Sequence, residues 1–181
     1  MRKIVLVYGT IAGIVLGAML FVTAPLFDSG VLNFDNGMYV GYATMVVSLS
    51  LVFFGVKSYR DNQQKGRITF WKAFQVGIFI CLLASLLYAL SWEVAYHTVS
   101  KGFTEEMSVH YERQIRKEAK SEAEMKKELE SSKQLMELYD RNPVVRFGFT
   151  VIEVLPVGVV ITLLTALLLR RKNFLPPTQP A

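Results

Sequence analysis

The chain has 181 residues, of which 52% are hydrophobic and 19% are charged, and 20 Lys and Arg against 15 Asp and Glu give a net charge of +5. Soluble domains carry about 25% charged residues, so this composition favours a membrane protein. The excess cations flank apolar runs and form no basic patch, which argues against nucleic-acid binding. A lone cysteine, Cys81, excludes an internal disulfide and a cysteine-based metal cluster.

Four apolar runs are long enough to cross a bilayer, and they predict an all-α membrane protein with four transmembrane helices. Three of them lie within residues 1–97, at about 4–24, 38–56 and 71–92, and the fourth, at about 147–169, belongs to the segment 147–172. Trp71 and Trp92 bracket the third run at a separation of about 32 Å along a helix, which is typical of aromatic belts at both interfaces.

The first run is predicted to be a retained span and not a cleaved signal peptide. It is longer than a signal core, and Pro25 directly follows Val22-Thr23-Ala24, which resembles a cleavage site, and should obstruct cleavage there. It also places Gly9, Gly13 and Gly17 on one helix face, where small residues allow close helix packing. This packing is expected within the chain, with a homo-oligomer as the alternative.

A polar bridge between the second and third spans sets the predicted orientation. The bridge carries one anion, Asp61, and five cations, whereas the loop at 28–37 has neither Lys nor Arg. Short cationic loops stay in the cytoplasm, so the bridge and both termini are predicted to be cytoplasmic. The proline-rich tail at 173–181 is predicted to be disordered. The bridge cations are Lys57, Arg60, Lys65, Arg67 and Lys72.

Residues 98–146 are predicted to form an extracytoplasmic amphipathic segment. Apolar residues recur four apart on residues 103–120, and Ser121 with Glu124 fits a capping box that opens a second helix ending near Asn142. The result is either a helical hairpin or one bent helix. Its dense mixed charge is typical of a solvated surface, and residues 103–141 are the part large enough to bind a soluble partner.

Three stretches resemble one family: the bridge YRDNQQKGRITFWKAFQVG, the outer LMELYDRNP and the last span's IEVLPVGVVITLLTALLLRRK. Together with Glu153-x-x-Pro156-x-Gly158 and the Gly66…Phe70 arrangement, they are similar to the bacterial family called domain of unknown function 4199. The resemblance covers essentially the whole chain. It implies a four-span fold in a bacterial inner membrane, and it implies no activity.

Glu153 is the first candidate functional residue, because a carboxylate within a span is costly and usually pairs, protonates or faces the bundle. Pro156 removes a helical hydrogen bond one turn later, so the two predict a polar site beside a helix break. Glu93 and His97 share a face of the third span on the same side of the membrane. This Glu/His/Glu set either relays a proton or, less expectedly, binds a metal; interfacial ion pairing is the alternative.

No catalytic motif is recognisable, so no enzyme activity and no cofactor is predicted. The leading hypothesis is a structural or interaction protein that presents the outer helices to an envelope protein. The alternative is a small proton-linked transporter or permease component that uses Glu153 with Glu93 and His97.

Overall fold

The computed structural model describes residues 1–171 and 173–176, and this part of the chain is helical with no strand. The prediction of an all-α protein is confirmed. In chain order the helices are α1 (Arg2–Asp28), α2 (Phe34–Leu49), α3 (Leu51–Gln63), α4 (Phe70–Thr98), α5 (Phe103–Glu118), α6 (Glu122–Arg141) and α7 (Pro143–Leu169).

Four helical stretches are long and apolar enough to cross a membrane, as predicted: α1, α2 with α3, α4 and α7. They extend beyond the expected bounds because polar residues cap them outside the apolar runs. Asn33 accepts hydrogen bonds from the first turn of α2, and Asn142 does the same for α7 with Pro143 at the first helical position. The connection between α1 and α2 is therefore shorter than the predicted loop at 28–37.

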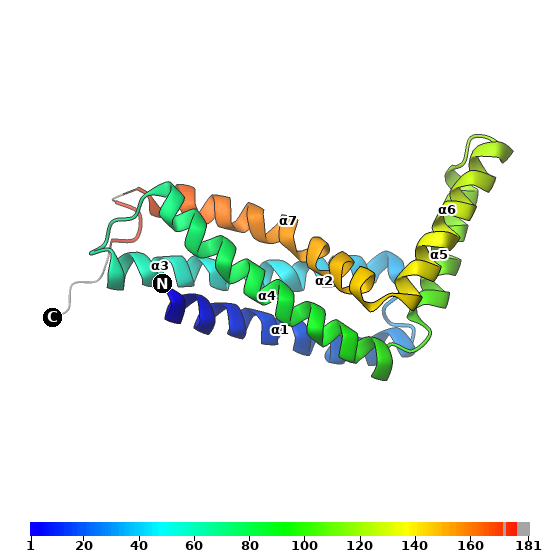
Figure 1. Ribbon diagram of the computed structural model, residues 1–181, viewed down its shortest axis with the longest axis horizontal. Coiled ribbons are helices and arrows are strands. Elements are labelled where there is room, and N and C mark those ends of the chain that lie inside the picture. The colour runs from blue at the N-terminus through cyan, green and yellow to red at the C-terminus, as the bar shows by residue number, and fades with distance from the viewer. Residues whose placement is uncertain (172, 177–181) are drawn as a thin grey trace.

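Helix α4 is the centre of the bundle, because it packs against α1, α3 and α7. Figure 1 shows these helices lying side by side, with α5 and α6 forming an arm that leaves one end at an angle. We call α5 and α6 (residues 103–141) the arm, and the end from which it leaves the arm end. Met1 and residues 173–176 lie at the opposite, terminal end.

The predicted glycine strip faces α4. A Cβ atom at Gly13 would lie 2.7 Å from the Leu87 Cβ, and one at Gly17 would lie 2.7 Å from the Ser91 Cβ. Gly9 meets Leu83 in the same way, so α1 approaches α4 at a distance that a side chain would prevent. The glycine strip is therefore used for packing between α1 and α4 of the same chain.

The basic bridge is mostly helical. Lys57 and Arg60 belong to α3 and both pair with Asp61 at 2.7 Å, Lys72 lies in α4, and only Lys65 and Arg67 lie in the connection between the two helices. The predicted polar loop is thus shorter than expected, because α3 continues past the apolar run.

Residues 173–176 of the predicted tail pack against the bundle. The buried Arg60 guanidinium donates hydrogen bonds to the carbonyl oxygens of Phe174 and Leu175, and the Phe174 ring lies edge-on to Phe53. A charged group with two carbonyl partners and a packed ring holds this segment at the terminal end. Residues 177–181 of the predicted tail lie outside the described residues.

The arm consists of two helices that pack against each other, not one bent helix. The Ser121 side chain accepts a hydrogen bond from the Glu124 amide at 3.2 Å and so caps α6, as predicted. The reciprocal bond differs from the expected one, because the Glu124 carboxylate accepts from the Lys120 amide and not from that of Ser121.

Candidate functional site: a cavity beneath the arm

A cavity of about 640 Å³ lies at the arm end between α1, α2, α4 and α7, with the arm above it. It exists because α2 packs against α1 and α7 but hardly touches α4. At the terminal end α3 closes the same side of the bundle by packing against α4 and α7. The bundle is therefore solid at one end and hollow at the other.

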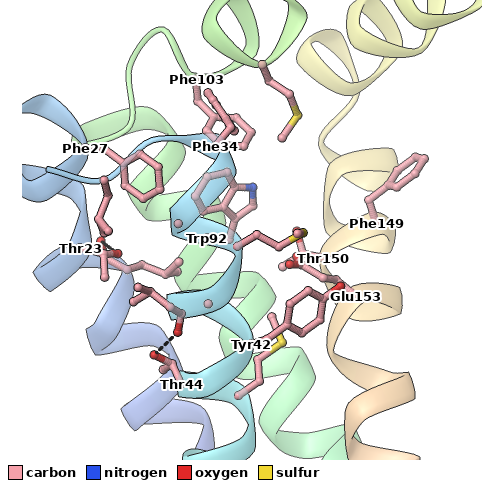
Figure 2. A pocket seen from close by; sticks show the side chains of 18 of the residues that line it. Thr23, Phe27, Phe34, Tyr42, Thr44, Trp92, Phe103, Phe149, Thr150 and Glu153 are labelled. Carbon is pink, nitrogen blue, oxygen red and sulfur yellow. Dashed lines mark hydrogen bonds between the residues drawn. The ribbon is translucent and has the colours of Figure 1, made fainter. Parts of the chain in front are cut away.

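The cavity lining is mainly aromatic, aliphatic and methionine side chains, with a few polar groups. The hydroxyls of Thr23, Thr44 and Thr150 each donate to a carbonyl oxygen four residues earlier in their own helix, which satisfies them locally. Figure 2 shows Glu153 beside Thr150 at the edge of this space. No hydrogen bond joins Glu153 to another described residue, so its carboxyl group is free to meet a ligand.

The predicted helix break at Pro156 is not observed. Helix α7 runs continuously through Pro156, which is exposed and does not line the cavity. The missing amide leaves the Ile152 carbonyl without its helical partner, and Ile152 also lies on the exposed side of α7. Two residues after Pro156, Gly158 meets Cys81 of α4, where an added Cβ would lie 2.9 Å from the sulfur.

A buried arginine ties the arm to the bundle beside the cavity. The Arg146 side chain is only 1% exposed, and its Nε and Nη2 atoms donate to the two Glu93 carboxylate oxygens at 2.9 and 2.8 Å. Its Nη1 donates to the carbonyl oxygens of Tyr139 and Asp140 at the end of α6, and its guanidinium lies 4.0 Å from the centre of the Tyr96 ring. One side chain of α7 thus joins α4 and α6.

Aromatic side chains complete the joint between arm and bundle. The Trp92 indole N–H donates to the Tyr139 hydroxyl at 2.7 Å, and the Phe103 ring lies edge-on to Trp92. The Tyr96 hydroxyl contacts Thr104 and donates to Asp140. Burial raises the pKa of Tyr139 to about 12, so its phenol stays neutral. We call these residues, with Arg146 and Glu93, the arm joint.

The structure does not assemble the predicted Glu/His/Glu set. Glu93 pairs with Arg146, and the His97 Nε2 lies 3.4 Å from Arg146 Nη2 and 4.0 Å from a Glu93 oxygen. Glu153 lies two helical turns from Arg146, about 10 Å along α7, and faces the cavity instead. His110, from α5, also lines the cavity. No group of three potential metal ligands occurs among the residues that the structure describes.

The family model described as "Protein of unknown function (DUF4199)" matches residues 7–171. The chain belongs to the DUF4199 family. Neither a curated protein nor a solved structure matches it. The DUF4199 match includes the whole cavity lining and the whole arm joint, because both lie between Leu16 and Glu153.

Sequence reasoning on this DUF4199 chain missed Arg146 as a site residue. An arginine at the edge of an apolar run, together with a Glu in another span, is a recognisable signal for an ion pair. Sequence reasoning also missed the cavity, because hydropathy does not show that α2 diverges from α4.

Proposed function

We propose that this protein is a multi-pass interaction protein of the bacterial inner membrane that holds the arm at the extracytoplasmic face for an envelope protein. The observation that carries the proposal is the rigid attachment of the arm. Its root is fixed to α4 and α7 by the arm joint, while the residues around its tip, from Glu112 to Glu130, are mostly exposed. A surface held in one orientation binds a partner at a lower entropic cost.

The distribution of cations supports this orientation. Arg2 and Lys3, Lys65 and Arg67, and Arg170 and Arg171 all occur at the terminal end, whereas the α1–α2 connection at the arm end carries no Lys or Arg. The positive-inside tendency therefore favours a cytoplasmic terminal end and an extracytoplasmic arm. Lys101 and Arg146 are the two cations beside the spans at the arm end, against the six named at the terminal end.

Cysteine labelling in intact cells tests the orientation. Single cysteines replace Ser29, Asn62 or Ser121, all exposed, in a Cys81→Ala background, and an impermeant thiol reagent is added from outside. Labelling is expected at positions 29 and 121 and absent at 62. Labelling at 62 without labelling at 121 would place the arm in the cytoplasm and remove the envelope partner.

Site-specific photocrosslinking tests the interaction itself. A photoreactive residue at Lys126, near the arm tip, is expected to give an adduct of one defined mass in growing cells. The matched control is Val31, which is 63% exposed in the α1–α2 connection at the arm end. Adducts that are absent at position 126, or identical at both positions, would refute an arm-specific partner.

The proton-linked transporter remains the second proposal, and Glu153 alone supports it. A carboxyl group that faces a cavity at membrane depth is typical of proton and substrate pathways. Glu93 contributes little to a proton pathway, since its carboxylate is already paired with Arg146. Reconstituted protein is expected to show a pH-driven flux that Glu153→Gln abolishes, and equal fluxes in the two proteins would contradict transport.

A further inference from the structure

We propose that the cavity beneath the arm binds a membrane-soluble amphiphile with a single amine or ammonium group, the cation lying against Glu153 and the apolar part among the aromatic and methionine side chains. This inference concerns the cavity and does not depend on the arm's partner.

The size and composition of the cavity fit such a ligand. Its volume of about 640 Å³ lies within the roughly 300–1,000 Å³ typical of small-molecule sites. Most of its lining is apolar, including five methionines, whose flexible side chains adapt to an apolar ligand. These methionines are Met19, Met38, Met45, Met107 and Met136.

The charge of the lining selects a cation. Glu153 is the one carboxylate among the described lining residues, and this lining contains neither Lys nor Arg. A carboxylate at this depth is costly unless it is paired, and Glu153 has no hydrogen-bond partner among the described residues. An ammonium group in the cavity would supply the missing partner through a charge-assisted hydrogen bond.

Aromatic rings favour the same chemistry. Tyr42, Tyr88, Trp92, Tyr139 and Phe149 all line the cavity that Glu153 faces, and Figure 2 shows Tyr42 and Trp92 around the same space. Ring faces attract ammonium groups, most strongly when the site excludes water. The head groups of neutral and anionic amphiphiles carry no cation for the rings or the carboxylate to attract.

The position of the opening explains why the ligand is an amphiphile and not an aqueous solute. Met38 and Tyr42 of α2 and Phe149 of α7 are lining residues that are also 45–54% exposed, so the cavity opens between α2 and α7. Glu153 is also exposed, and it lies about six residues, or 9 Å, inside the predicted fourth span, which begins near residue 147. The opening therefore faces the bilayer.

Photolabelling of the full-length protein in phosphatidylcholine nanodiscs tests the proposal. The probes are a photoreactive hexadecylamine, the matched hexadecanol and the matched hexadecanoic acid, and mass spectrometry gives the labelled fraction and the labelled residues. We expect saturable labelling of cavity residues by the amine, and about tenfold less labelling by the alcohol and the acid.

Two pairs of variants separate the contributions of charge and space. Glu153→Gln is expected to lower amine labelling about tenfold, whereas its neighbour Ile152→Gln, on the exposed side of α7, leaves it unchanged. Gly41→Leu is expected to fill the cavity and block labelling, because Gly41 lines it and an added Cβ meets nothing within 4 Å. Gly148→Leu has the same open surroundings outside the cavity lining and is the control.

Equal labelling by the amine, the alcohol and the acid would overturn the proposal, as would amine labelling that persists in Glu153→Gln. Labelling that Glu153→Gln removes but Gly41→Leu leaves intact would place the cation outside the cavity and overturn it too. Circular dichroism and the elution volume of each variant establish that it is folded.

Discussion

The coupling between Glu93 and Arg146 is the prediction that tests the arm joint most directly. Glu93→Gln keeps the shape of the side chain and removes its charge, so it leaves the buried guanidinium without its carboxylate. Breaking a fully buried ion pair costs about 3–5 kcal/mol. Here the Glu93 side chain is 22% exposed and Arg146 keeps two carbonyl oxygens of α6, so we expect a coupling energy of about 2 kcal/mol.

A double-mutant cycle of Glu93→Gln and Arg146→Met measures this coupling. The assay is the free energy of unfolding in mixed micelles, obtained by titration with a denaturing detergent. The chain provides a matched control, because Glu112 and Arg116 form an exposed pair of the same two residue types at 2.6 Å on α5. That control cycle should give only about 0.3–0.5 kcal/mol.

The expected outcome is therefore a clear difference between a buried arginine–glutamate pair that joins two helices and an exposed pair within one helix. If both cycles gave less than about 0.5 kcal/mol, burial would add nothing to the ion pair and the arm would not depend on it. If Glu93→Gln also left the protease sensitivity of the arm unchanged, Arg146 would not be what fixes the arm to the bundle.

Three further outcomes follow from packing and charge. Gly13→Ala should lower the unfolding free energy by about 1–3 kcal/mol, because its Cβ would overlap α4, whereas Gly148→Ala, in open surroundings, should not; equal effects in the same micelle titration would contradict close helix contact. Arg60→Ala should release residues 173–176 and speed their hydrogen exchange, while exchange in the arm stays constant. Since burial raises the pKa of Tyr139 from its ordinary value near 10 to about 12, its neutral phenol contributes stability that is complete below pH 10 and is lost as the pH rises through 12. Tyr139→Phe should flatten that part of the pH profile, and an unchanged profile would show that Tyr139 does not titrate there.

The four spans were predictable because each is a long apolar run whose signal is local to the sequence. The same is true of the Ser121 cap on α6, which depends on residues close together in the chain, whereas the sequence left open whether the arm is a hairpin or one bent helix. The helix ends were less predictable, because Asn33 and Asn142 lie outside the apolar runs that define a span.

The candidate site was only partly predictable, because it depends on which helices diverge. Hydropathy identified Glu153 as a carboxylate that is costly to bury in the membrane. We grouped it with Glu93 because both were predicted to lie on the same side of the membrane. The side chains of Glu93 and Arg146 meet because α4 and α7 are neighbours with matching register, which is a tertiary property. Likewise, the sequence presents Arg60 only as one of the orienting cations, whereas in the fold it binds the carbonyl oxygens of Phe174 and Leu175.

The central place of α4 also determines when the protein can be completed during synthesis. Its neighbours α1 and α7 come from opposite ends of the chain, so α1 waits in the bilayer until α4 is made, and α4 waits for α7. At about 5–20 residues per second, roughly 6 to 23 seconds separate the end of the first span from the start of the last. Throughout that interval the glycine strip of α1, and then the far side of α4, faces lipid. A chain that stops before α7 would leave α4 without its α7 contacts and the arm without Arg146.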